Sequence, residues 1–316
     1  MLYILFWGLG LASAFDHHDC TRRHSVDHVM CQYMRKFGRE YDDAEFEHRM
    51  RNVMQKVDHG RHSTETVHYG MNAISDRVFV ENAFLQRASP YTAETFSRNR
   101  LQTFKLPDTL DLRDKMQPVK DQGDCGSCYT FAGVSVLEYH AGVSISEQKI
   151  MDCSSSTNGP SYGCDGGWPE NVYEYAKQWP VVLEKDMPYT QKNAACNQTC
   201  AGSVAKVLRY GTLTREKDEK AETRIPYMLN AHGPVSVAID VGTTDLLMSY
   251  EDGIFPASAC GQDVDHAVTI VGYTPDYWIV RNSWSADWGD EGYFYLERDV
   301  NACGVAEYLG YVSKVQ

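Results

Sequence analysis

The segment DQGDCGSCYTF, residues 121–131, holds the residues best suited to covalent chemistry in this chain of 316 residues. A thiol is mostly protonated at neutral pH, so a nucleophilic cysteine needs a neighbour that stabilises its thiolate. At the first turn of a helix, the sulfur meets unpaired backbone N–H groups and the positive end of the helix dipole. The apolar residues that follow at helical spacing predict such a helix, beginning at Cys128.

Cys125 and Cys128 also form a C-x-x-C pair, a pattern that occurs in several kinds of site. Two cysteines three positions apart can form a redox-active disulfide, or can bind zinc together with further ligands. They can also belong to a plain disulfide scaffold. The segment alone therefore leaves all of these alternatives open beside a thiol peptidase.

A histidine and an asparagine that could complete a catalytic site follow much later in the chain. His266 lies in VDHAVTIVGY, 138 residues after Cys128, and Asn282 lies in YWIVRNSW, 154 residues after it. An imidazole can pair with the thiolate as an imidazolium and later protonate the amine that leaves a cleaved peptide. An asparagine at the far side of the ring would hold its orientation. A lone histidine in an apolar run is usually a core residue, but this one comes with the rest of the constellation.

Hydrophobic periodicity predicts a mixed framework for these residues. Residues 128–140 predict a buried helix, with Ser127 available as its N-cap. The runs VSVAI, HAVTIVGY, YWIVRN and GYFYLE are rich in β-branched and aromatic residues, which predicts a second half made mostly of strands. Between residues 25 and 60 the spacing predicts two further helices, one of them starting near Asp42.

The signature CGSCY, the later histidine and asparagine, and the tryptophan-rich NSWSADWG resemble the papain family of cysteine peptidases, in particular its cathepsin L-like branch. The resemblance spans residues 106–316. It implies an α+β fold of two lobes, a helical lobe with Cys128 and a β-barrel-like lobe with His266 and Asn282, and a substrate cleft between them. A helical propeptide domain is implied before the peptidase domain.

The resemblance also implies roles for residues around the nucleophile. Gln122 is expected to donate its side-chain amide to the developing oxyanion, together with the backbone N–H of Cys128. Trp284 is expected to shield the histidine and asparagine from water, with Trp288 nearby. Core packing of these tryptophans is compatible with that role.

The segment GCDGGW resembles the glycine-rich wall of the family's cleft, where Gly166 and Gly167 would let a substrate pair with the backbone as an added strand. The pocket for the second residue before the scissile bond is implied to be apolar and to favour aliphatic or aromatic side chains over Arg. A shift of one residue would place Glu307 at its floor and reverse that preference. The implied lining is Trp168, Pro169, Ala238, Val264, Ala267 and Tyr308.

Ten cysteines behind an apolar leader suit an oxidising compartment. Family pairing implies three disulfides in the peptidase domain and leaves the nucleophile as a thiol. Cys20 and Cys31 could close a bridge in the pro-segment, and Cys200 is an alternative partner for Cys153. Asn197 opens a glycosylation sequon. No metal ion or cofactor is expected. The implied disulfides are Cys125–Cys164, Cys153–Cys196 and Cys260–Cys303.

The order of segments predicts a secreted precursor. Residues 1–14 are apolar and end in the small-x-small pattern of a signal peptide, and neither they nor any later run is long enough to predict stable membrane insertion. Residues 15–105 resemble the family's inhibitory propeptide, because residues 70–76 match its G-x-N-x-F-x-D motif with Ile74 in place of Phe. They end in a polar, exposed connector that leads to the peptidase domain, residues 106–316.

Charge is unevenly distributed between these parts. Residues 15–105 carry a net charge of +1 and eight of the eleven histidines, whereas residues 106–316 carry −14. The acidic domain excludes nucleic acid as a partner. The expected partners are peptide and protein substrates and the propeptide itself, acting on a monomer. Acidification is hypothesised to release the propeptide by protonating carboxylates at the contact and charging buried histidines, whereas charging exposed histidines would tighten the complex.

The sequence therefore predicts a cysteine endopeptidase made as a zymogen in the secretory pathway, for an extracellular or lysosome-like destination. Only ten residues separate Cys153 from Cys164, with no histidine pair among them, so no occluding loop of the carboxydipeptidase kind is expected and both ends of the cleft should be open. The alternatives are an exopeptidase of the same family, a catalytically silent binding protein of the same fold and a thiol oxidoreductase.

Overall fold

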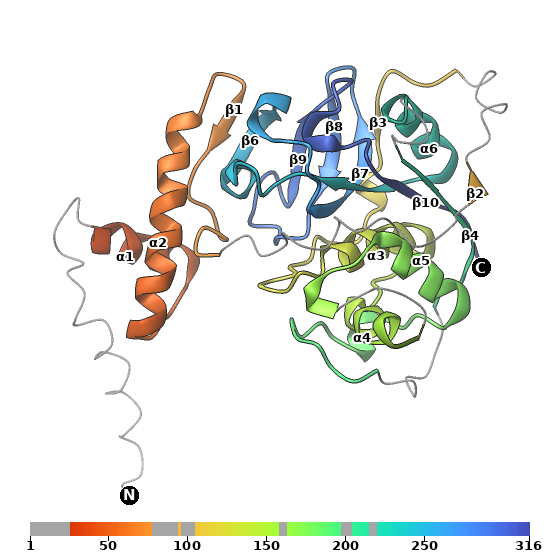
Figure 1. The fold of residues 1–316 in the computed structure, drawn as a ribbon, viewed down its shortest axis with the longest axis horizontal. Coiled ribbons are helices and arrows are strands. Elements are labelled where there is room, and N and C mark those ends of the chain that lie inside the picture. The colour runs from red at the N-terminus through yellow and green to blue at the C-terminus, as the bar shows by residue number, and fades with distance from the viewer. Residues whose placement is uncertain (1–25, 78–93, 96–104, 158–162, 197–203, 215–219) are drawn as a thin grey trace, which may run out of the picture.

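A computed structural model of the chain describes residues 26–77, 94–95, 105–157, 163–196, 204–214 and 220–316. In this part of the chain, two lobes carry separate hydrophobic cores, and a small helical unit with a core of its own lies beside the strand-rich lobe (Figure 1). The mixed architecture confirms the expected α+β fold. The predicted signal peptide and most of the predicted connector lie outside the described residues.

The helical lobe is built around α3 (Cys128–Ala141), which begins at the residue that the sequence predicts. α3 is buried along most of its length and packs against α5 (Pro169–Gln178) and α4 (Glu147–Thr157). Gly133 permits the close approach of α3 to α5, because a Cβ at this position would lie 2.6 Å from the side chain of Val172. The helix that begins at Cys128 is therefore packed closely against α5.

The strand lobe contains the four strands that the apolar runs predict, and β5 and β7 are buried throughout. The strands follow the order β1-β6-β9-β8-β7-β5-β10-β4-β2, with β3 paired to β7. α6 (Ile225–His232) packs on β7 and β10. The strands are β1 (Val67–Tyr69), β2 (Glu94–Thr95), β3 (Leu110–Asp111), β4 (Val207–Leu213), β5 (Val235–Ile239), β6 (Tyr250–Phe255), β7 (His266–Tyr273), β8 (Tyr277–Arg281), β9 (Tyr293–Glu297) and β10 (Leu309–Val315).

The N-terminal unit consists of the two expected helices, α1 (Val26–Phe37) and α2 (Asp43–His59). The side chain of Asp42 caps α2 by accepting the backbone N–H of Glu45 at 2.9 Å. The motif at residues 70–76 closes the unit, because its last residue, Asp76, is buried and accepts hydrogen bonds from both the α2 helix and the loop before it.

This unit docks on the strand lobe through main-chain and side-chain contacts. β1 pairs antiparallel with β6, and Figure 1 shows the two strands next to each other. The Gly70 N–H donates to the carbonyl oxygen of Ser249 at 2.7 Å, and the Asn72 side chain donates to that of Met248 at 2.7 Å.

Among the described residues, no helix has both the length and the apolar character that a membrane crossing requires.

Candidate active site

Cys128 lies at the first turn of α3, buried and 4% exposed. Its Sγ accepts the backbone N–H of Ala267, in β7, at 3.3 Å, so the thiol contacts the strand lobe directly. Both this N–H and the positive end of the α3 dipole favour a negative charge on sulfur.

The expected capping role of Ser127 is wrong. Ser127 occupies the N-cap position of α3, but its side chain accepts no N–H from the helix. The hydroxyl instead hydrogen-bonds the Tyr189 hydroxyl at 2.6 Å. A tertiary partner has taken the oxygen that a local cap would have used.

His266 is the first residue of β7, and its Nε2 lies 2.9 Å from Oδ1 of Asn282, just after β8. The same oxygen accepts the backbone N–H of Ser283 at 2.9 Å, which identifies it as the acceptor in both contacts. Nε2 therefore carries a hydrogen, and Nδ1 is the ring nitrogen that can exchange a proton with a thiol. The structure thus brings the three residues of the predicted constellation to one interlobe contact.

Trp284 covers one face of the imidazole. The rings of Trp284 and His266 stack with centroids 4.8 Å apart and planes 25° apart. Trp288 is fully buried, lies edge-on to Trp284 at 5.1 Å and donates its indole N–H to Met248. Trp284 therefore makes the direct contact that the family resemblance implies, whereas Trp288 supports it from within the core.

Gln122 is buried in the loop that leads to Cys128. Its Nε2 donates to the carbonyl oxygen of Cys125 at 3.0 Å, and its Oε1 accepts the hydroxyl of Ser283 at 2.5 Å. These two contacts fix which way the amide points. Ser283 was not singled out from the sequence, although it directly follows Asn282.

The glycine-rich segment packs close to α3. Gly166 has a φ of 107°, a conformation that side chains other than glycine rarely adopt. A Cβ on Gly167 would lie 2.9 Å from the ring of Tyr129. Glycine is thus needed here both for the backbone conformation and for close packing.

Three of the residues expected at the apolar pocket, Trp168, Ala238 and Tyr308, form one buried cluster, with Val264 packed against it. The rings of Trp168 and Tyr308 lie 4.9 Å apart. Pro169 begins the adjacent helix α5. Ala267 instead packs against Cys128 and Tyr129, and Glu307 accepts the side-chain N–H of Asn301, so Tyr308 rather than Glu307 belongs to the cluster.

The three implied disulfides are present. They join Cys125 to Cys164, Cys153 to Cys196 and Cys260 to Cys303. Because Cys125 bonds Cys164 and not Cys128, the alternatives of a C-x-x-C redox disulfide and of a zinc site are wrong, and the described residues contain no group of side chains that could hold a metal ion. Cys20, Cys200 and Asn197 lie outside the described residues, as do the predictions that involve them.

Ion pairs between the N-terminal unit and the loop of residues 121–127, which precedes α3, were not expected from the sequence. Arg77 forms two hydrogen bonds of 2.7 Å with the carboxylate of Asp121, the neighbour of Gln122. Arg49 lies 3.3 Å from the carboxylate of Asp124. The N-terminal unit therefore binds the loop that leads into α3 through two ion pairs.

Asp265 brings a further titratable group next to the histidine. Its carboxylate accepts the backbone N–H groups of Val241 and Gly242 at 2.8 and 2.9 Å. Burial outweighs these bonds and raises the pKa of Asp265 to about 6. A carboxyl group whose pKa is raised into the mildly acidic range thus lies one residue from His266.

Known proteins share this organisation. The family model described as papain family cysteine protease matches residues 106–313. The chain is 35% identical to a cathepsin L-like proteinase of Fasciola hepatica, covering 89% of this chain and 92% of that protein, and 33% identical to the thiol protease aleurain of Arabidopsis thaliana, covering 90% and 84%. The solved digestive procathepsin L2 proteinase from the larval midgut of Tenebrio molitor superposes with a TM-score of 0.77, at 26% identity, over 92% of this chain and all of that one. The chain belongs to the papain family of cysteine proteases.

Proposed function

We propose that the chain is the zymogen of an endopeptidase in which Cys128 is the nucleophile, His266 the proton carrier and Asn282 the residue that orients the histidine. The observation that carries this proposal is the meeting of the Cys128 sulfur with the start of β7, where His266 is held by Asn282. Nucleophile and base come from different lobes, so a substrate in the cleft reaches both at once.

In the proposed reaction, the Cys128 thiolate attacks the carbonyl carbon of the scissile bond. The negative charge moves to the carbonyl oxygen, where the Gln122 amide and the Cys128 N–H donate to it. The C–N bond breaks as the His266 imidazolium gives its proton to the leaving amine. Water then attacks the thioester, His266 takes its proton, and the thiolate leaves.

Substrate selection is proposed to reside in Gly166, Gly167 and the apolar cluster around Trp168 and Tyr308. The glycines allow main-chain pairing with an extended peptide, and the cluster accepts an aliphatic or aromatic side chain. The cluster consists of apolar and aromatic side chains, which cannot pair with a guanidinium, so we expect discrimination against Arg.

Residues 15–105 are proposed to act as the intramolecular inhibitor and residues 106–316 as the peptidase, after removal of a signal peptide at residues 1–14. The docked N-terminal unit and the three disulfides support a zymogen that folds in the secretory pathway. We propose an extracellular or lysosome-like destination.

An internally quenched peptide blocked at both termini tests this function. Acid-processed enzyme should cleave it, and the thiol-reactive peptidyl epoxide E-64 should label Cys128 and stop the cleavage. A Cys128→Ala variant is the matched control. Cleavage confined to substrates with a free terminus would instead identify an exopeptidase, and an unlabelled Cys128 would identify a catalytically silent protein.

A further inference from the structure

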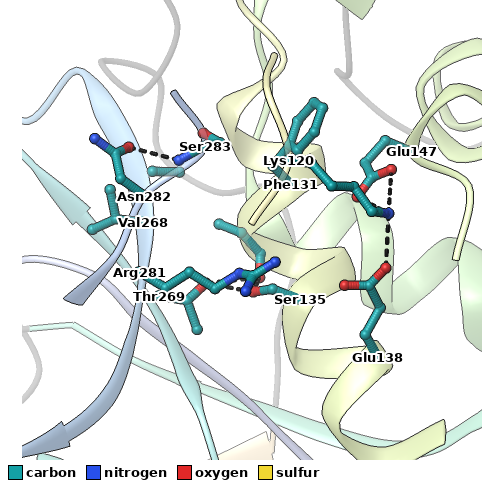
Figure 2. A pocket seen from close by; sticks show the side chains of 12 residues that line it. Lys120, Phe131, Ser135, Glu138, Glu147, Val268, Thr269, Arg281, Asn282 and Ser283 are labelled. Atoms are coloured by element: carbon teal, nitrogen blue, oxygen red, sulfur yellow. Dashed lines mark hydrogen bonds and ion pairs between the residues drawn. The ribbon is translucent and has the colours of Figure 1, made fainter. Parts of the chain in front are cut away.

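A buried charge cluster lies behind the interlobe contact. Lys120 Nζ lies 2.7 Å from Glu138 Oε1, in α3, and 2.8 Å from Glu147 Oε1, in α4, and it also donates to the carbonyl oxygen of Ile145 at 2.8 Å. Figure 2 shows the Lys120 side chain between the two carboxylates, on the wall of a small cavity that Asn282 and Ser283 also line. Three hydrogen-bond donors of one ammonium group thus tie residue 120 to the helical lobe.

The main chain at the same position is tied to the other lobe. The carbonyl oxygen of Lys120 accepts the N–H of Ser285 at 3.2 Å, the N–H of Gln122 donates to the carbonyl oxygen of Ser283 at 2.9 Å, and Asp121 and Trp284 form an antiparallel bridge. Residues 120–122 therefore lie antiparallel alongside the segment that follows Asn282. One residue, Lys120, contacts the helical lobe with its side chain and the strand lobe with its backbone.

We propose that Lys120, through Glu138 and Glu147, is the positioning residue that sets Gln122 against the Cys128 sulfur. The inference rests on the proposed function, because it concerns the donor that the oxyanion needs. Glu138 lies on α3, the helix that begins with Cys128, and it forms an ion pair with Lys120. Because Gln122 is two residues from Lys120, this ion pair fixes the position of Gln122 relative to α3. An oxyanion donor acts only if it is placed before the reaction starts.

The charge on Lys120 fits such a tie. Glu138 and Glu147 are buried, and burial raises the pKa of Glu147 well above its ordinary value. Burial opposes the charge on Lys120, but the attraction of Glu147 and Glu138 outweighs it and raises the pKa of Lys120. The cluster thus holds one cation that stays charged across the acidic and neutral range.

Removing Lys120 alone would leave buried carboxylates without their cation, which by itself destabilises a protein. The decisive variant is therefore the neutral triple Lys120→Met, Glu138→Gln and Glu147→Gln, made as full precursor, processed with added pepsin and compared per mole of reactive thiol. Two reactions are measured: peptide hydrolysis, which develops an oxyanion, and alkylation of Cys128 by iodoacetamide, which forms an S–C bond, releases iodide and develops none.

We expect kcat for the peptide to fall roughly tenfold to hundredfold, less than the roughly hundredfold to thousandfold that complete loss of one oxyanion donor produces, because the amide is displaced and not removed, with KM nearly unchanged. The alkylation rate should change less than about threefold, because thiolate attack on iodoacetamide needs no oxyanion donor. When the triple change is added to Gln122→Ala, kcat should fall little further, since both act through one amide.

Full kcat in the triple variant would overturn the proposal by showing that Lys120 only neutralises its neighbours. Parallel losses of hydrolysis and alkylation, or full additivity with Gln122→Ala, would overturn it too. If the triple variant does not fold, Glu138→Gln alone should lower kcat for peptide hydrolysis by a smaller factor and leave the alkylation rate nearly unchanged. Equal losses of both rates in Glu138→Gln would overturn the proposal as well. Absence of peptide hydrolysis in the unmodified enzyme would refute the proposed function instead.

Discussion

His59 offers a quantitative test of the hypothesis that acid releases the propeptide. This α2 residue is 8% exposed, and its Nδ1 lies 2.7 Å from the hydroxyl of Ser249 in the strand lobe. Burial, followed by the charges of Lys56 and His62, lowers the pKa of His59 to about 4 from an ordinary 6.5, against a smaller opposing effect of Asp58. The docked state therefore favours the neutral imidazole.

The sign and size of the effect follow from linkage. Above pH 6.5 the imidazole is neutral whether docked or released, so it adds no pH dependence. As the pH falls below 6.5 the released state binds a proton that the docked state resists, and the penalty on docking grows until the pH approaches 4. At pH 5, about 1.5 pH units below the pKa of the released imidazole, the penalty on docking is about 2 kcal/mol, or roughly 30-fold in the docking equilibrium.

The perturbation is His59→Gln, which stays neutral and can still hydrogen-bond Ser249. Brief pulses of E-64 report the fraction of precursor in which Cys128 is reachable. We compare the ratio of the wild-type labelling rate to the variant labelling rate at two pH values. This ratio should be about 30 times larger at pH 5 than at pH 7, because only the wild-type precursor gains a proton at residue 59. His48→Gln, an exposed change on the same helix, is the matched control and should behave as wild type. Equal rate ratios at both pH values for His59→Gln would refute the reasoning.

Three further changes test the proposed site. Asn282→Ala removes the oxygen that holds His266 Nε2 at 2.9 Å, and kcat should fall roughly tenfold to hundredfold, part of what general acid–base catalysis supplies; an unchanged kcat would remove the orienting role. Tyr308→Glu places a carboxylate in the apolar cluster, so the kcat/KM ratio for Arg over Leu at the second residue before the cut should rise, and a fixed ratio would show that the pocket lies elsewhere. Arg77→Gln breaks two hydrogen bonds to Asp121 at the mostly buried interface, so E-64 should label the precursor several-fold faster at pH 7, and wild-type labelling there would show that this pair does not hold the zymogen closed.

Local patterns determined much of the site. Hydrophobic spacing was enough to start α3 at Cys128, because an amphipathic or buried helix is recognisable over a few turns. The same holds for the strands that begin with His266 and end just before Asn282. The capping role of Ser127 was wrong for the opposite reason: its partner, Tyr189, lies far along the chain, and a local rule cannot anticipate it.

The sequence by itself determined which residue types could do chemistry, where helices and strands begin and, through the family resemblance, which cysteines pair. Only the tertiary structure decided which charges face each other. Lys120 meets Glu138 and Glu147 across two elements, and His59 meets Ser249 from 190 residues away. Such contacts depend on how whole lobes pack, and burial then sets their energies, because a charge that water would screen at the surface must find a protein partner inside.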